Sequence, residues 1–343
     1  MISIIVPIYN CEDFLQYGIK SIIRQSYPNW ELVLINDGST DQSGTICDKC
    51  VEQESRILVI HQTNGGPSIA RNAGLKAIRG EHCIFMDSDD YFEVNAFQTM
   101  ADIVMDKDPQ VIFYPNITDK IINGRYVPIN NNIMYNNSIR SNQEFKEFYE
   151  ELKTHRYLYP VWNKLYKKDF IIKSNASFPP KISICEDMEF NLFLYPKLEQ
   201  AELIDTPLYH YVSRNYNSIT TTFNRSRFNE SKIVYLNCLE IYKKWNCSQI
   251  NFIRNEFVTN ISVCINGLFN KDCPYVFKDK RNYVLEIIGD NVVQTTLNAF
   301  TPLGIRNHII SLLIIAKKVY LLLIAGSLTR KLRCWRYGSW KTL

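Results

Sequence analysis

Short apolar runs alternate with segments of helical periodicity through the first hundred residues of the chain. Runs such as ISIIVPI and ELVLI show no polar alternation, which is typical of strands covered on both faces in a parallel sheet. The pattern predicts strands over residues 2–8, 31–36, 57–61, 82–87 and 110–114, and helices over residues 12–25, 42–54, 67–78 and 94–105. This alternation predicts a Rossmann-like, doubly wound α/β fold with a mostly parallel sheet.

The order of elements becomes less regular in the middle of the chain. An Asn-rich stretch at 130–138 favours turns, and a helix is predicted at 141–153. We expect residues 139–222 to extend the sheet. The periodicity then predicts long helices between 226 and 290 and a further, more apolar helix at 304–326, so the C-terminal region is helical.

The composition describes a globular chain with an uneven charge. Its 343 residues are 46% hydrophobic and 22% charged, which is enough to bury a large core. The net charge of +4 belongs to the C-terminus, since residues 303–343 hold eight Lys or Arg and no acid. The 31 remaining basic side chains face 35 acidic ones in residues 1–302, a net charge of −4. Nucleic-acid binding by the main body is therefore not expected.

The cysteines and the N-terminus bear on the compartment. Ten cysteines fall at irregular spacings, and MISIIVPIYN reads as a buried strand rather than as a leader, so we expect a cytoplasmic site of action. Cys47 and Cys50 form the one CxxC and lie within a predicted helix. Without a second close pair they predict helix packing, not a zinc or redox site.

Four carboxylates follow two of the predicted strands: Asp37 and Asp41 in NDGSTD, and Asp87 and Asp89 in MDSDD. Since the carboxyl ends of strands in an open α/β sheet face the ligand crevice, these acids should converge. They suit a nucleotide diphosphate with a divalent cation. The turn after the first strand, PIYNCE, has no glycine and there is no Walker A loop, which excludes a glycine cradle for phosphates.

Each acidic pair allows a functional and a structural interpretation. Asp37 could accept the imide N–H of uracil, or Asp37 and Asp41 could make only turn and N-cap hydrogen bonds. If the chain stays extended, Asp87 and Asp89 point the same way and could bind Mg²⁺ or Mn²⁺. An isolated DxD is otherwise a solvated acidic turn.

The motifs PIYN, NDGSTD, NGGPSIARNAGL, MDSDD, WNKLY and CEDMEF occur in an order that resembles the family 2 glycosyltransferases with the GT-A fold, over residues 1–222. The resemblance implies transfer of a sugar from a nucleotide donor, usually with inversion at the anomeric carbon. By position it implies a metal-binding pair in Asp87 and Asp89. It also implies nucleotide and donor binding by Pro7, Tyr9, Asp37, Arg71 and Asp87.

The acidic pair of CEDMEF, Glu186 and Asp187, resembles the site of the family's general base. An inverting transfer needs a carboxylate on the face opposite the leaving diphosphate to take the acceptor's proton. Both acids could instead cap or complement the start of the following helix. Asp187 is preferred to Glu186 only through the resemblance.

Two further segments are candidate contacts. Trp162, Asn163 and Lys164 could form part of an acceptor subsite, or the segment could simply pack. Arg214 lies in a loop-like stretch, YHYVSRNYNSIT, that could close over the diphosphate, and a guanidinium suits a phosphate partner.

The apolar C-terminal stretch carries two lysines that split it into runs of eight, residues 309–316 and 319–326. A bilayer span needs about 20 apolar residues. On a helical wheel Asn307, Ser311 and Lys318 share one narrow stripe. With the basic, Trp-containing segment that follows, this predicts an interfacial helix on an anionic leaflet. The alternative is a core or dimer helix.

Together these features predict a GT-A catalytic domain with a helical region and a basic, membrane-associating tail. The expected ranges are 1–222, with a nucleotide-sugar half at 1–115 and an acceptor half at 116–222, then 223–302 and 303–343. We expect a metal-dependent inverting glycosyltransferase that uses a UDP-sugar on a polyprenyl-linked saccharide. It would act at the cytoplasmic face of the cell membrane, in capsule or lipopolysaccharide synthesis.

Two other classes of protein remain as alternatives. A sugar-phosphate nucleotidyltransferase would carry a segment like GxGTRL after the first strand, where this chain has PIYNCED. A non-catalytic nucleotide-sugar-binding scaffold would be favoured if the acids were missing, and all of them are present.

Overall fold

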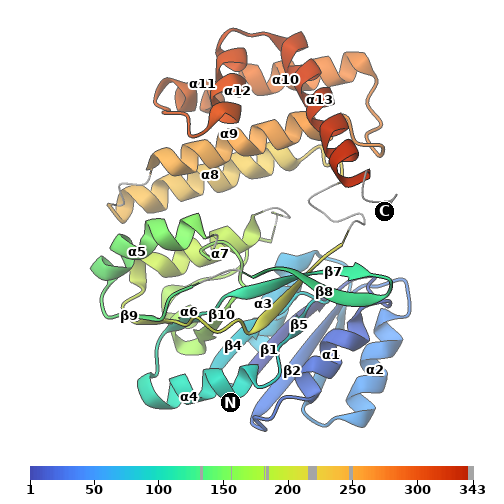
Figure 1. The fold of residues 1–343 in the computed structure, drawn as a ribbon, viewed down its shortest axis with the longest axis vertical. Helices are drawn as coiled ribbons and strands as arrows, with labels where there is room; N and C mark the ends of the chain where they lie inside the picture. Colours follow the sequence, from blue (N-terminus) through green and yellow to red (C-terminus); the bar gives the residue numbers. More distant parts are fainter. Residues whose placement is uncertain are drawn as a thin grey trace. The chain divides into compact units, whose positions relative to one another are not determined.

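The chain forms two compact units, Met1–Asn215 and Tyr216–Leu343 (Figure 1). Each unit is described by itself. The computed structural model describes residues 1–131, 134–155, 157–180, 182, 185–214, 222–246 and 250–338.

An eight-stranded sheet forms the centre of the first unit, in the order β3-β2-β1-β4-β10-β6-β11-β9. The first four of these strands are mutually parallel, whereas β10 runs antiparallel to both of its neighbours. The bounds are β1 Ile2–Ile8, β2 Trp30–Asp37, β3 Ile57–Gln62, β4 His82–Phe85, β6 Val111–Phe113, β9 Asn137–Ile139, β10 Lys164–Lys167 and β11 Ala201–Leu203. This confirms the α/β prediction and the extension of the sheet by the middle of the chain.

Helices cover both faces of this sheet, as the unbroken apolar strands require. Neighbouring side chains of a strand point to opposite faces. Ile4 belongs to a core cluster with Leu15 of α1, while the next residue, Ile5, lies against Gly74 of α3, where an added Cβ would come within 2.4 Å of it. The helices of the unit are α1 Leu15–Ile23, α2 Ser43–Gln53, α3 Pro67–Ala77, α4 Ala96–Lys107, α5 Asn142–Thr154, α6 Lys168–Ser174 and α7 Glu186–Leu194, followed by a short 3₁₀ turn, η1 Tyr195–Lys197.

A second, four-stranded sheet was not predicted. It has the order β5-β12-β7-β8, with β5 Tyr91–Phe92, β7 Asn116–Ile122, β8 Arg125–Asn131 and β12 Tyr209–Ser213. β7 and β8 form a hairpin whose turn residues, Asn123 and Gly124, both have positive φ, as a two-residue primed turn requires. The predicted turn region at 130–138 is therefore partly strand, and 132–133 lie outside the described residues.

Several predicted boundaries were wrong. The first helix begins at Leu15 rather than at residue 12, and β4 ends at Phe85, before the acidic motif. The stretch predicted to be loop-like, YHYVSRNYNSIT, begins as strand β12, because it pairs with both β5 and β7. Its last six residues, 215–220, lie outside the described residues.

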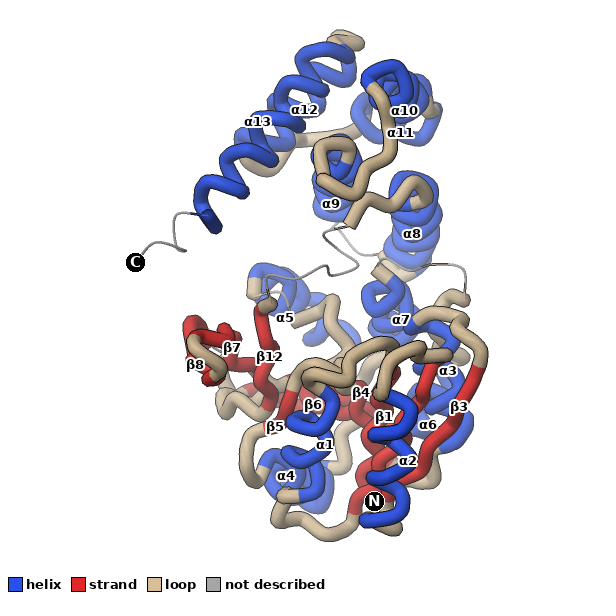
Figure 2. The backbone as a smooth tube through the Cα atoms, turned by 90° about the vertical axis from the view of Figure 1, so that its right-hand side faces the viewer, coloured by secondary structure: helices blue, strands red, loops and turns tan. Residues whose placement is uncertain are grey.

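The second unit is helical, as predicted. Its helices are α8 Arg227–Lys244, α9 Ile250–Gly267, α10 Phe277–Gly289, α11 Asn291–Asn298, α12 Ile305–Ile315 and α13 Val319–Gly338. Figure 2 shows the helices of this unit. Among the described residues, no helix combines the length and the apolar character needed to span a bilayer.

The prediction of a single helix at 304–326 is wrong, because the helix is interrupted between α12 and α13. Lys317 adopts a left-handed conformation, with φ of 51°. Its N–H donates to the Ile314 carbonyl, and the Lys318 N–H donates to the Leu313 carbonyl at 2.9 Å. This is a Schellman motif, which ends a helix by satisfying its last carbonyls. Lys318 therefore does not continue the polar stripe of Asn307 and Ser311.

The packing prediction for the CxxC motif is confirmed. Both cysteines lie in α2, where Cys47 belongs to the buried core cluster and Cys50 packs against it. Burial raises the pKa of Cys47 to about 12.

Candidate functional site: a carboxylate cluster around a buried arginine

Arg71 of α3 lies at the centre of the cluster, with 5% of its side chain exposed. Its Nη2 lies 3.0 Å from Asp87 Oδ1, and its Nη1 lies 3.0 Å from Glu186 Oε1 and 3.1 Å from Asp187 Oδ1. Burial alone would lower the pKa of Arg71, but the charges of Asp187, Asp87 and Glu186 raise it above its usual value. One guanidinium thus joins the end of β4 to the start of α7.

Asp37, at the end of β2, builds the loop that leads into α3. Its carboxylate accepts hydrogen bonds from the N–H groups of Gly65 and Gly66, both at 2.8 Å, and from Gln62 Nε2 at 2.7 Å. Gly66 has a φ of +86°, which explains the glycine at the position before Pro67. These bonds match the turn-forming interpretation of Asp37, and its Oδ2 retains one lone pair for a ligand.

Asp41 makes turn hydrogen bonds but is not the N-cap of α2, which is Gln42. Its Oδ1 accepts from the Ser43 N–H at 2.9 Å and its Oδ2 from the Glu12 N–H at 3.1 Å. These bonds link the loops that follow β1 and β2. Asp41 therefore lies beside the edge of the sheet without joining the cluster around Arg71.

The DxD segment is a turn and not an extended strand, so the premise of the sequence argument was wrong. The Asp90 N–H donates to the Asp87 carbonyl at 3.1 Å, which closes a turn over Ser88 and Asp89. Asp87 and Asp89 point to different arginines, Arg71 and Arg214, and keep 33% and 43% of their side chains exposed.

Arg214, which directly follows β12, holds the second acid of the motif. Its Nη1 lies 2.5 Å from Asp89 Oδ2 and its Nη2 donates to the Asp89 carbonyl at 2.6 Å. Its guanidinium carbon lies 3.9 Å from the ring centre of Phe14. Burial and the charge of Asp87 raise the pKa of Asp89, and Arg214 partly offsets them.

Asp90 and Tyr209 support the motif and were missed from the sequence. The Tyr209 hydroxyl donates to Asp90 Oδ2 at 2.8 Å and accepts from the Asp87 N–H at 3.1 Å. Asp90 Oδ1 accepts from the Val212 N–H. Burial and the charges of Asp89 and Asp87 raise the pKa of Asp90 well above its usual value. For Asp90 the available sequence signal was its place as the third acid of MDSDD. Tyr209, which is 119 residues away, showed no such signal.

Glu186 and Asp187 form the first turn of α7, directly after Cys185, whose φ is positive. The Val161 N–H lies 3.4 Å from Asp187 Oδ2. Burial raises the pKa of Asp187 to about 7, against the opposing charge of Arg71. A carboxylate that exchanges a proton near neutral pH is suited to general-base chemistry.

The remaining predicted contacts lie in different environments. Pro7 is a half-buried residue near the end of β1, and Tyr9, just beyond it, is exposed. The Trp162 ring stacks on Tyr209 and Tyr211, with ring centres 4.9 and 5.7 Å apart. Trp162 and Tyr211 are the partly exposed members of this stack, so they remain candidates for sugar contact.

Asn163 and Lys164 are fully buried, which favours the packing interpretation for this part of the segment. Lys164 Nζ donates to the Tyr157 carbonyl at 2.6 Å and to the Pro160 carbonyl at 2.5 Å. Burial lowers the pKa of Lys164 well below its usual value. The lysine thereby supports the loop that offers the Val161 N–H to Asp187.

The acidic turn offers two exposed carboxylates to a cation. No group of three or more His, Cys, Asp or Glu side chains arranged for a metal occurs in the described part of the chain. Mg²⁺, however, commonly binds one or two carboxylates and completes its shell with waters and substrate phosphates. Burial, and after it the charges of the neighbouring acids, raise the pKa values of Asp89 and Asp90. Asp87 and Asp89 therefore fit a divalent ion.

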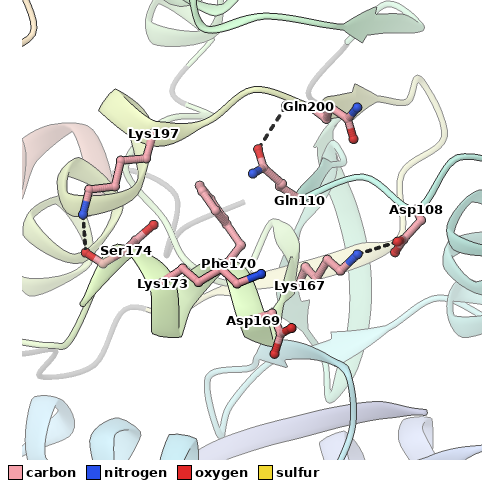
Figure 3. A pocket seen from close by; sticks show the side chains of 9 residues that line it. All are labelled: Asp108, Gln110, Lys167, Asp169, Phe170, Lys173, Ser174, Lys197 and Gln200. Atoms are coloured by element: carbon pink, nitrogen blue, oxygen red, sulfur yellow. Dashed lines mark hydrogen bonds and ion pairs between the residues drawn. The ribbon is translucent and has the colours of Figure 1, made fainter.

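The first unit also holds a separate cavity of about 330 Å³. Figure 3 shows the side chains that line it. Gln110 precedes β6, Lys167 ends β10 and Gln200 precedes β11, so the cavity lies at the edge where β4 begins. Asp87 follows the opposite end of β4. This cavity is thus remote from the cluster around Arg71.

The candidate site thus joins an acidic turn and an acidic helix start at the carboxyl edge of a doubly wound sheet. Residues 3–173 match the family described as Glycosyl transferase family 2. The chain belongs to this family, and its fold is the α/β GT-A fold with a helical C-terminal region.

Two relatives from Bacillus subtilis (strain 168) illustrate the similarity. The uncharacterized glycosyltransferase EpsJ is 35% identical over 223 residues, which cover 64% of this chain and 63% of EpsJ. EpsH is 28% identical over 314 residues, which cover 87% of this chain and 86% of EpsH. The match to EpsJ thus spans less than two thirds of that protein.

A solved structure shares the fold along most of the chain. Residues 1–349 of Staphylococcus aureus TarS, in complex with UDP-GlcNAc, superpose with a TM-score of 0.62 at 19% identity. The match covers 98% of this chain and 92% of the TarS chain. At this identity the likeness concerns the fold alone.

Proposed function

We propose that this chain is an inverting glycosyltransferase that moves a sugar from a nucleotide donor, a UDP-sugar, to a hydroxyl of a saccharide acceptor. One observation carries the proposal: Arg71 contacts both the DxD carboxylate Asp87 and the Glu186–Asp187 pair. Donor and acceptor chemistry would therefore meet within reach of one side chain. The family membership and the UDP-GlcNAc bound by TarS support this choice of donor.

The proposed donor side is the carboxyl edge formed by β1, β2 and β4. Pro7, Tyr9 and Asp37 would contact the base, with the free lone pair of Asp37 Oδ2 directed to an imide N–H. Asp87 and Asp89 would hold Mg²⁺ or Mn²⁺, which would neutralise the leaving diphosphate. Arg214, already beside Asp89, would exchange this carboxylate for a phosphate oxygen when the donor binds.

The proposed acceptor side is the start of α7. Asp187 would take the proton of the attacking hydroxyl, because its pKa near 7 lets it be deprotonated at neutral pH and still accept a proton. Glu186 would share the charge of Arg71 and is the second candidate for this role. Trp162 and Tyr211 would offer aromatic faces to the acceptor sugar.

The acceptor that we propose is a lipid-linked saccharide in cell-surface polysaccharide synthesis, met at the cytoplasmic face of the membrane. The basic C-terminal segment supports a membrane surface as the place of reaction.

The test is nucleotide release from a panel of UDP-, GDP- and dTDP-sugars, with a set of saccharide acceptors. We expect UDP release that depends on the acceptor and on Mg²⁺ or Mn²⁺. Pyrophosphate release from a nucleoside triphosphate and a sugar phosphate would instead identify a nucleotidyltransferase. Binding of a UDP-sugar without release under any condition would identify a scaffold.

A further inference from the structure

Helices α12 and α13 of the second unit turn apolar side chains to solvent. Six of these exposed residues we call the outer face: Ile309, Leu312 and Ile315 on α12, with Leu321, Ile324 and Leu328 on α13. Ile305 and Tyr320 on the same helices are exposed as well. Single exposed apolar residues are common, but this many on two consecutive helices is typical of an interaction site.

The orientation of α12 is fixed by polar contacts on its inner side. Asn307 is buried, and its Nδ2 donates to Thr259 Oγ1 at 3.1 Å and to the Asn255 carbonyl at 3.2 Å on α9. Arg306 donates to Ser262 Oγ of the same helix at 2.7 Å. Because the polar stripe of α12 faces α9, much of its apolar surface faces outward.

The orientation of α13 is fixed by close packing. An added Cβ at Gly326 would lie 3.1 Å from Ile265 and 3.1 Å from Phe269. Leu322 and Leu323 are buried, so Leu321 and Ile324 are left on the exposed side. α12 and α13, dark orange and red in Figure 1, both pack on α9. The residues of the outer face thus lie on the sides of the two helices that α9 leaves uncovered.

The charge around the outer face indicates which kind of partner would bind there. Residues 303–343 carry eight Lys or Arg and no acid, and Lys317 and Lys318 are exposed shortly after Ile315. A second copy of the chain would place equal positive patches against each other in a two-fold interface. An apolar face with a basic surround instead matches the interface of a bilayer that contains anionic lipid.

We propose that the outer face is the surface through which this chain docks on an anionic lipid bilayer, with its apolar side chains at the acyl boundary and the lysines among the headgroups. The inference deepens the proposed function and rests on it for the lipid-linked acceptor. Docking itself is measured without donor or acceptor, so a failed docking experiment leaves the proposed transfer standing.

The test is sedimentation of the full chain with vesicles of phosphatidylcholine, with and without phosphatidylglycerol. We expect binding to the anionic vesicles, and we expect it to fall when salt rises from about 0.1 M to about 1 M, which shortens the Debye length from about 10 Å to about 3 Å. The double variant Leu312→Glu, Ile324→Glu should bind at least about tenfold more weakly, because two apolar contacts are replaced by charges.

The matched control is the double variant Ile233→Glu, Leu236→Glu on α8. Its residues are exposed to a similar extent in the same unit, and it changes the net charge equally. It should bind vesicles more tightly than the outer-face variant, and both should melt like the wild type. Serine in place of glutamate at Leu312 and Ile324 provides a milder pair if the glutamates unfold the chain.

Three results would overturn the proposal. The full chain could fail to sediment with anionic vesicles. The outer-face variant could bind as tightly as the control variant. Size-exclusion chromatography could show a dimer that only the outer-face substitutions dissociate, which would make the face an interface between copies.

Discussion

Arg71 is a buried cation that three carboxylates share, and its removal would leave those acids next to one another without compensation. Its position makes it a positioning residue for the general base that we propose, because it touches Asp187 rather than the reacting atoms. The charge of Arg71 also lowers the pKa of Asp187, against the larger effect of burial. The role of Arg71 can therefore be read from a pH profile.

The first prediction concerns that profile. Burial raises the pKa of Asp187 to about 7, and only the deprotonated form can act as a base, so kcat/KM should rise with pH through about 7. Arg71→Gln removes the charge that lowers this pKa, so the rise should move to higher pH, while Arg71→Lys should stay closer to the wild type. A profile whose midpoint does not move in Arg71→Gln would contradict the coupling.

The second prediction concerns the metal. Asp89→Asn should lose most turnover, because an amide cannot replace the charge of a carboxylate ligand, and excess EDTA should abolish the activity of the wild type. The measurement is the rate of UDP release at saturating donor. Asp108→Asn, an exposed carboxylate at the opposite end of β4, should keep normal activity. Full activity in EDTA would contradict the assignment of Asp87 and Asp89 as metal ligands.

At the scale of elements, hydrogen bonds from β12 connect the second sheet to the acidic turn. Tyr209 and Val212 on this strand both hydrogen-bond to Asp90, and Tyr209 also accepts the Asp87 N–H. The geometry of Asp87 and Asp89 thus depends on a strand more than 110 residues away.

The third prediction tests this link. Tyr209→Phe removes the hydroxyl and leaves a buried carboxylate oxygen and a backbone N–H without their partner, so the free energy of unfolding should fall by about 1–3 kcal/mol. Metal affinity should fall as well. Tyr211→Phe, at an exposed position two residues further along the strand, is the control and should unfold like the wild type. Equal stability of the two variants would contradict the structural role proposed for the Tyr209 hydroxyl.

The sequence predicted best those elements in which nearly every residue is buried. β1 and β2 are almost entirely buried, so their apolar runs indicate strands directly. β8 is largely exposed and β12 carries buried polar residues such as His210, so neither shows a clear period. The break between α12 and α13 depends on one left-handed lysine, a conformation that the residue type does not indicate.

At the scale of the whole molecule, the candidate site brings together segments that are far apart in the chain. Arg71 and Glu186 are 115 residues apart, and Tyr209 and Asp90 are 119 residues apart. Sequence motifs named Asp87, Asp89 and the Glu186–Asp187 pair, because each follows or begins a predicted element. The resemblance also named Arg71, but as a nucleotide contact. Its position between the two acidic pairs, and the buried side chains that support them, depend on tertiary contacts, which no local pattern contains.

The measurement that tests the proposed function most directly compares Asp187→Asn with the wild type in two assays, donor binding by calorimetry and sugar transfer to a saccharide acceptor. Loss of a general base should leave binding of the UDP-sugar and metal intact and slow transfer by about 10²-fold or more. Glu186→Gln should be less impaired. Near-normal transfer by Asp187→Asn, with Glu186→Gln inactive, would move the role by one residue. Near-normal transfer by both variants would contradict the assignment of this cluster as the active site.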